Sequence, residues 1–227
     1  MIANEQNRYL LLNYMKLDAQ AAEEVSSLLT LARPTDARFP RSIYQHEGRD
    51  RLLEFVALPD LAAVGALLTD SAWLEIERSV RPRLSVDFRR QVYGLRHAVR
   101  QRSALPTAPA LQLLRMEVTP QLSQSYGALR EQTLYSHVEK SSVVESFAAL
   151  EASISTEPGS LYLSGFTCEK ARFIEEFTVG RAREFMTEAG NRFVIGGAPA
   201  IHTSVWFKRV IPGTTQTEPH AENTSPC

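Results

Sequence analysis

Two glutamates are candidate acid/base groups because each lies in a similar short motif. Glu54 belongs to RLLEF and Glu176 to RFIEEF, and both motifs are expected to form strands that run into a helix. Since side chains alternate between the faces of a strand, Phe55 and Phe177 would share one face and the glutamates the other. A carboxylate in an apolar cavity has a raised pKa and can act as a general base near neutral pH.

A second set of reactive side chains alternates along the last expected strand. His202, Ser204 and Trp206 would lie on one face, with Thr203 and Val205 on the other. An imidazole, a hydroxyl and a flat indole together suit a planar aromatic or polyketide ligand. The alternative interpretation places Trp206 in a core and His202 at a sheet edge.

Weaker candidates for ligand contact lie on the first and fourth expected strands and in the second hairpin. They are Asn13, Tyr14, Tyr93, His97 and Tyr162. Each of these residues is more often a packing residue than a chemical one. Trp73, at helical spacing with Ile76 and Val80, is interpreted as a core anchor.

The glutamates also have a purely structural interpretation. Each could pair with a neighbouring arginine such as Arg96 or Arg115, or a register shifted by one residue could expose it to solvent.

Motifs for metals, nucleotides and activated nucleophiles are absent from the sequence. It contains no C-x-x-C, H-E-x-x-H, P-loop, G-x-G-x-x-G or G-x-S-x-G pattern. The five histidines show no metal-ligand spacing, so we expect no zinc site and no bound cofactor. Sequence spacing leaves a single-histidine haem site open.

Composition indicates an ordinary globular protein. The chain has 227 residues, of which 44% are hydrophobic and 22% charged, which excludes disordered and fibrous classes. The net charge of −1 gives no overall attraction to nucleic acid or anionic membrane. The sequence has only two cysteines, its first ten residues are polar, and it has no apolar run long enough to span a membrane. We therefore expect a cytoplasmic location.

The hydrophobic pattern predicts the order β-α-β-β-α-β twice. In the first half we expect strands at 9–17, 42–46, 50–57 and 89–99, with helices over 18–33 and from Pro59 to about Pro82, the latter with a second cap at Asp70. In the second half we expect strands at 111–119, 161–168, 172–179 and 202–211. Helices are expected over 121–155, broken near 137–142, and over 180–190.

These elements suggest two tandem units of one kind. The expected organisation is a ferredoxin-like unit at 1–102, a linker at 103–110, a second ferredoxin-like unit at 111–211 and a disordered tail at 212–227. The similarity of RLLEF to RFIEEF supports a duplication, because each motif was expected at the same place in its unit.

Apolar residues on both faces of the expected sheets predict how the units pack. Leu10, Leu12 and Tyr14 alternate with other apolar residues, and helices cover only one face of such a sheet. The fold class is therefore α+β, with the two units packed sheet to sheet as an intramolecular barrel and the helices outside. Glu54 and Glu176 would then point into the barrel.

The segment 51–84 (RLLEFVALPDLAAVGALLTDSAWLEIERSVRPRL) resembles the dimeric α/β-barrel superfamily. Similar patterns occur in its antibiotic-biosynthesis monooxygenases and polyketide cyclases. The resemblance implies a small-molecule enzyme of secondary metabolism. As we align the strand, those monooxygenases carry asparagine where this chain has Glu54 and tryptophan where it has Leu58, so a cyclase fits better.

Eight arginines between Arg78 and Arg102, against the single acid Asp87, form a possible docking face for a carrier protein or an anionic substrate. The alternative is a solvated face balanced by acids elsewhere. A homo-oligomer is also possible; we expect no nucleic-acid or membrane partner.

Three functions remain open. The first is a cofactor-independent enzyme that cyclises or rearranges a polyketide-like or aromatic substrate. Glu54, Glu176 and His202 would be its acid/base groups. The substrate-binding cavity would be lined by Asn13, Tyr14, His97, Tyr162, Ser204 and Trp206. The second is an oxygenase acting on a phenolic substrate without a cofactor. The third is a ligand-binding or assembly protein without activity.

Overall fold

The computed structural model describes residues 8–18, 20–31, 39–101, 104–155 and 159–209. In the first half, the strands are β1 (Tyr9–Lys16), β2 (Arg41–His46), β3 (Arg51–Leu58) and β4 (Arg89–Val99). The helices are α1 (Ala22–Leu31), α2 (Ala62–Thr69) and α3 (Ser71–Val80). Asp70 caps α3 as predicted, since its side chain accepts a hydrogen bond from the Trp73 amide at 2.9 Å.

The second half repeats the order. Its strands are β5 (Ala110–Met116), β6 (Ser146–Ile154), β7 (Ser160–Phe166) and β8 (His202–Lys208). Its helices are α4 (Ser123–Leu129), α5 (Ser136–Lys140), α6 (Lys170–Thr178) and α7 (Arg181–Arg192), with a π-helical turn (Arg130–Tyr135) between α4 and α5. Short 3-10 turns lie at Arg81–Arg83, Pro120–Leu122 and Ala198–Ala200.

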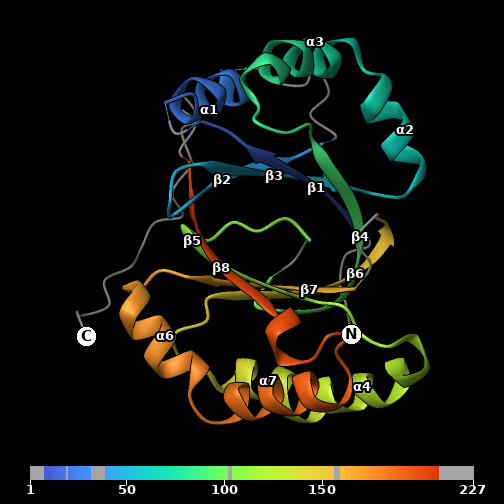
Figure 1. The fold of residues 1–227 in the computed structure, drawn as a ribbon, viewed down its shortest axis with the longest axis vertical. Coiled ribbons are helices and arrows are strands. Elements are labelled where there is room, and N and C mark those ends of the chain that lie inside the picture. Colours follow the sequence, from blue (N-terminus) through green and yellow to red (C-terminus); the bar gives the residue numbers. More distant parts are fainter. Residues whose placement is uncertain (1–7, 19, 32–38, 102–103, 156–158, 210–227) are drawn as a thin grey trace.

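All eight strands close into one antiparallel barrel in the order β1-β3-β2-β8-β5-β7-β6-β4 (Figure 1). The two four-stranded sheets join where β2 pairs with β8 and where β4 pairs with β6. Helices α1–α3 cover one sheet from outside and α4–α7 cover the other (Figure 1). The predicted α+β barrel of two β-α-β-β-α-β units is confirmed.

Strand alternation divides the core into an inner layer and two outer layers. The inner layer lies between the sheets and includes Leu12, Phe55 and Leu161, whereas the outer layers pack each sheet against its own helices. Residues two apart on one strand therefore share a layer. This alternation determines which strand residues of the candidate site face the barrel interior.

Two element predictions in the second half were wrong. Residues 146–154 form strand β6, not the end of a long helix, and residues 170–178 form helix α6, not a strand. In α6, Phe173 and Phe177 are four residues apart and both buried, while Glu175 and Glu176 between them are exposed. Strand β6 is rich in alanine, and its pairing with β4 and β7 overrides a helix-like composition. The second hairpin is thus β6–β7, and RLLEF and RFIEEF are not equivalent.

The segment between the units lies inside the barrel. Ala104 and Leu105 are buried in the inner layer. The Ser42 hydroxyl donates to the Pro106 carbonyl at 2.8 Å, and the Tyr44 hydroxyl donates to the Ala108 carbonyl at 2.7 Å. Residues 104–109 therefore fill the barrel near the start of β5 and the end of β7.

The proposed domain boundaries stay a prediction, and the tail at 212–227 lies outside the described residues. In the part of the chain that the structure describes, no helix has the length and apolar character needed to cross a membrane.

Candidate functional site

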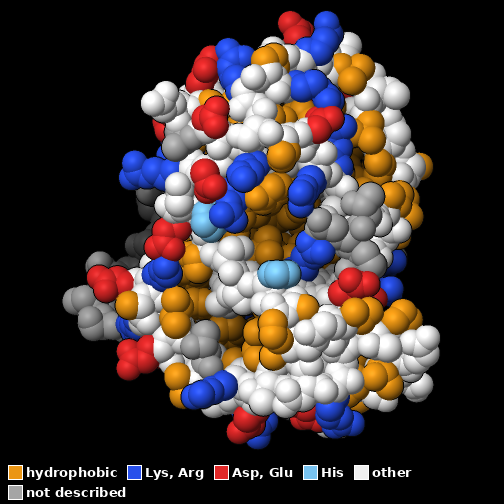
Figure 2. Space-filling model, viewed as in Figure 1, with side chains coloured by type: hydrophobic (Ala, Val, Ile, Leu, Met, Phe, Trp, Pro, Cys, Tyr) orange, Lys and Arg blue, Asp and Glu red, His pale blue; other side chains and the backbone are white. Residues whose placement is uncertain are grey.

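A cavity of about 580 Å³ opens at one end of the barrel. Figure 2 shows it as a hollow with a hydrophobic floor and basic side chains around its edge. It lies within the size range of small-molecule pockets. Its walls come from both units and from six strands, β1, β3, β4, β5, β7 and β8. The lining residues are Leu12, Tyr14, Arg51, Leu53, Arg89, Gln91, Tyr93, Leu113, Arg115, Leu161, Ile201, His202, Thr203, Ser204 and Trp206.

Strand β8 places three of the predicted residues at this cavity. His202, Ser204 and Trp206 alternate along the strand on its inner face, while Val205 packs toward the helices. The Trp206 indole donates to the Ser204 hydroxyl at 2.8 Å. Trp206 is buried and His202 is exposed at the opening, so the set spans the depth of the cavity.

Tyr14 of β1 faces Trp206 across the cavity. The two rings are 6.4 Å apart and nearly perpendicular, at 78°. The imidazole of His46 also packs edge-on against Trp206, with ring centroids 5.0 Å apart. Burial and the nearby Arg51 guanidinium lower the pKa of His46, which favours its neutral form. Trp206 is therefore a buried apolar wall in contact with two other rings.

Three arginines and a glutamine at the cavity were missed by sequence reasoning. Arg51, Arg89 and Arg115 lie on inward-facing strand positions close to the opening, and Gln91 and Tyr93 lie deeper on β4. The signal was present in the sequence, because Arg51 is two residues from Leu53 and Arg115 two residues from Leu113. It could be recognised only once the inward face of each strand was known.

The prediction that Glu54 faces the barrel interior was wrong. Phe55 is the inward residue and packs against Tyr44 with ring centroids 5.6 Å apart, so Glu54 points the other way, toward the helices. There, one carboxylate oxygen lies 2.6 Å from Arg41 and the other accepts a hydrogen bond from the Asn13 amide at 2.9 Å. The side chain is only 2% exposed. Glu54 is thus a buried ion-pair partner away from the cavity, as in the alternative interpretation, although with a different arginine.

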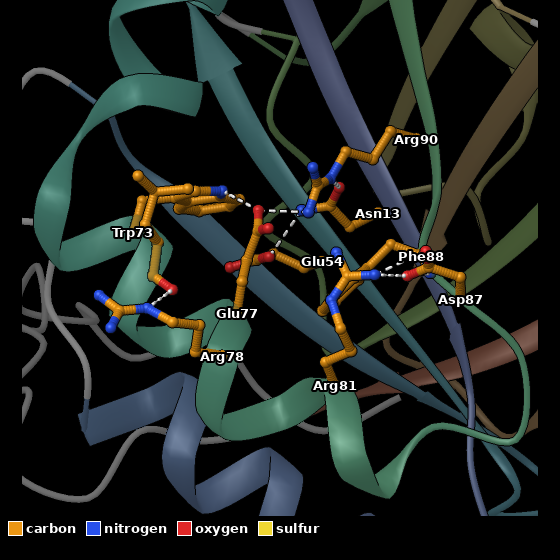
Figure 3. A network of polar contacts seen from close by, with 10 residues as sticks. Asn13, Glu54, Trp73, Glu77, Arg78, Arg81, Asp87, Phe88 and Arg90 are labelled. Carbon is orange, nitrogen blue, oxygen red and sulfur yellow. Dashed lines mark hydrogen bonds and ion pairs between the residues drawn. The ribbon is translucent and has the colours of Figure 1, made fainter.

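Figure 3 shows that Glu54 belongs to a larger polar network beneath α3. The guanidinium of Arg90 donates to the Asn13 side-chain oxygen at 3.2 Å and also pairs with Glu77. Glu77 accepts a hydrogen bond from the Trp73 indole. The network therefore links α3 to strands β1, β3 and β4. Trp73 is 3% exposed, in agreement with a core anchor.

Comparison with solved structures identifies the architecture. An anthrone oxidase-like protein has a TM-score of 0.67 at 11% identity, with 91% of this chain and 93% of that chain covered. A ferredoxin-fold protein related to antibiotic biosynthesis monooxygenases, from Listeria monocytogenes 4b F2365, has a TM-score of 0.54 at 8% identity, covering 90% and 96%. The chain shares the ferredoxin-like fold of these proteins.

A haem-degrading enzyme from Listeria monocytogenes shares this fold at a TM-score of 0.53 and 7% identity, with 88% of this chain and 99% of that chain covered. No protein-family model and no curated protein matches the sequence. At such low identities the likeness establishes the fold, and the reaction has to be argued from the site.

The fold places Glu176 far from where it was predicted. It lies on the exposed face of helix α6 and pairs with Arg172, four residues earlier, at 2.7 Å. The prediction that it points into the barrel was wrong, because its segment is a helix and not a strand.

Asn13, His97 and Tyr162 also lie outside the cavity, contrary to prediction. Asn13 belongs to the network beneath α3. The ring of His97 stacks on Tyr135 at 4.0 Å, on the helix side of the second sheet, and burial lowers its pKa. Tyr162 is buried on the same side, with its hydroxyl 2.5 Å from that of Tyr126. Of the predicted ligand-contact residues, Tyr14, Tyr93, Ser204 and Trp206 are at the cavity.

The arginines between 78 and 102 do not form one face. Because successive strand residues point in opposite directions, Arg89 lies at the cavity and Arg90 beneath α3. Others pair with separate acids: Arg81 with Asp87, Arg83 with Glu24 and Arg96 with Glu151. Arg102 lies outside the described residues. A carrier-protein partner stays a prediction.

A second, more apolar hollow of about 380 Å³ lies between the second sheet and helices α6 and α7, bordered by Leu134, Phe177, Phe185 and Met186. Within the described ranges, no group of three or more His, Cys, Asp or Glu side chains is arranged to hold a metal ion. The barrel cavity is the better candidate site, because it combines an apolar wall with a titratable imidazole and several hydrogen-bonding groups.

Proposed function

We propose that this protein is a small-molecule enzyme that cyclises or rearranges an aromatic or polyketide-like substrate in the barrel cavity by proton transfer. The observation that carries the proposal is the gathering of His202, Ser204, Trp206 and Tyr14 around one enclosed space. An apolar cavity folds a flexible substrate into the conformation that brings its reacting carbons together. The proposed reaction uses no cofactor.

His202 is the proposed proton-transfer group. Its neutral imidazole takes a proton from the acidic carbon between two carbonyls of the substrate. The resulting enolate carbon attacks a second carbonyl of the same molecule, a carbon–carbon bond forms, and the imidazolium returns the proton to the new alkoxide. In this scheme the hydroxyls of Tyr14 and Ser204, which line the cavity, donate hydrogen bonds to the enolate oxygen. Glu54 and Glu176 have no part in this scheme.

The test is the rate of product formation with the His202→Ala variant. A general base typically contributes a factor of about 10² or more, so we expect the rate to fall about a hundredfold. Glu176→Gln is the matched control, because Glu176 lies on an outer helix and its loss should leave the rate unchanged. An unchanged rate in the His202 variant would contradict the proposed role of His202, whereas no product formation by the parent chain would favour a binding protein.

The second candidate is a cofactor-independent oxygenase, which the likeness to the anthrone oxidase-like protein favours. An oxygenase would consume oxygen with a hydroxyanthrone, whereas a cyclase would not. Oxygen uptake by the purified protein with such a compound separates the two reactions.

A further inference from the structure

The cavity extends only part of the way through the barrel. On four strands its lining ends at a leucine, and the next inward-facing residue, two positions deeper, no longer borders it. The lining leucines are Leu12, Leu53, Leu113 and Leu161, and the residues beyond them are Leu10, Phe55, Leu111 and Leu163. The deeper four are at most 1% exposed and belong to the inner layer of the core. They therefore form a floor beneath the cavity.

The segment at 104–109 fills the barrel behind this floor. The side-chain ammonium of Lys208 donates to the Thr107 carbonyl at 3.0 Å, in addition to the two hydroxyl donors on β2. Ala108 lies so close to β7 that a Cβ at Gly165 would come within 2.6 Å of the Ala108 Cβ. Because that end of the barrel is filled, a ligand enters and leaves the cavity by the single opening at its other end.

Phe55 has the largest side chain of the floor and borders the cavity lining in two directions. It lies two residues from Leu53 on β3 and directly opposite Leu12 on β1. Its ring is fully buried and packs edge-on against Tyr44, with ring centroids 5.6 Å apart. The Tyr44 hydroxyl is in turn bonded to the Ala108 carbonyl of the segment. In such a close-packed interior, a ligand that reaches Phe55 cannot displace it without disrupting the core.

We propose that Phe55 determines specificity at this site by fixing how far the apolar part of a ligand can enter. This inference rests on the proposed function and adds a size limit to it. Tyr14, His202 and Ser204 supply polar groups at the cavity, whereas leucines and Trp206 form its inner walls. Apolar groups gain by leaving water for such walls. The ligand class is therefore an aromatic compound with a polar end at the opening and a short apolar part against the floor.

Isothermal titration calorimetry of the full chain with 4-alkylphenols of increasing chain length tests the size limit. Each methylene that leaves water should tighten binding about fourfold, until the chain reaches the floor and the affinity stops rising. Phe55→Leu shortens the floor side chain, so the affinity should go on rising for about two to three more methylenes. Leu53→Phe fills part of the cavity and should end the rise about two methylenes earlier.

Phe147→Leu is the matched control, because Phe147 is equally buried but lies in an outer layer, against Tyr135 and Tyr162. It should lower stability without changing the chain length at which the affinity stops rising. The hollow beside α6 and α7 has no lining residue on β3, so binding there would not respond to Phe55→Leu.

Three results would each overturn the inference: undetectable binding of every alkylphenol, an affinity that rises through the whole series in the parent chain, or the same limiting length in the parent and in the folded variants. Leu53→Phe removes nothing from the core, so it tests the limit even if Phe55→Leu does not fold. The outcome is separable from that of the proposed function. A limit that moves, together with full turnover by His202→Ala, would reject proton transfer by His202 and leave the size limit standing.

Discussion

Raising the pH above 10 is expected to unfold this protein steeply. Burial raises the pKa of Tyr44, Tyr126, Tyr135 and Tyr162 in the folded chain. The folded state therefore holds these protons at a pH where the unfolded chain, with tyrosine pKa near 10, releases them. The stabilisation is fully present below pH 10 and is lost as the pH rises toward the folded-state pKa values.

The size of the effect follows from the number of tyrosines. Each withheld proton lowers the free energy of unfolding by about 1.4 kcal/mol per pH unit, so four lower it by about 5 kcal/mol per unit. Because domains of this kind are stable by about 5–15 kcal/mol, unfolding should occur within about one to three pH units above 10. Circular dichroism recorded against pH should show this loss of structure as one steep step.

The control for the alkaline transition is Tyr44→Phe. Tyr44 is fully buried, and its hydroxyl donates to the Ala108 carbonyl. The variant should lose one of the four withheld protons and so reduce the pH slope by about a quarter. The same pH slope of unfolding in the parent chain and in Tyr44→Phe would contradict the assignment.

Replacing Glu54 with glutamine should lower the free energy of unfolding by about 3 kcal/mol. The change removes the carboxylate charge that lies 2.6 Å from the guanidinium of Arg41, whose side chain is 8% exposed. Removing one partner of a buried ion pair typically costs about 3–5 kcal/mol, because the remaining charge is buried and uncompensated. Urea denaturation, with an unchanged slope and a lower midpoint, should show the loss.

Two further variants test whether the loss of stability comes from the buried ion pair between Arg41 and Glu54. Glu176→Gln breaks an exposed pair on one helix and should cost only about 0–0.5 kcal/mol. In the double variant Arg41→Met with Glu54→Leu, apolar side chains of similar size replace both charges, so much of the lost stability should return. A Glu54→Gln variant as stable as the parent chain would show that the pair contributes little.

The sequence predicted the parts of the fold that depend on local patterns. Alternating apolar residues identified β1, β4 and β8, and a capping aspartate identified the start of α3. Apolar residues on both faces of Leu10–Tyr14 required a second covering layer, which led to the barrel. The errors at β6 and α6 arose where composition was ambiguous and strand pairing decided the outcome.

The candidate site was predicted only in part, for a simple geometric reason. Alternation states which residues share a face of a strand, but not which face turns inward. For β8 the inward set could be recognised from His202, Ser204 and Trp206 themselves. For β3 both faces carry apolar residues, and Phe55 rather than Glu54 turned out to face the interior.

The sequence by itself therefore determined the elements, their repetition and the need for two sheets to cover each other, because these follow from hydrophobic periodicity along the chain. Only the tertiary structure decided the inward face of each strand and the gathering of Arg51, Arg89 and Arg115 at one opening. These depend on closure of the barrel, in which pairing between distant strands fixes register and direction together.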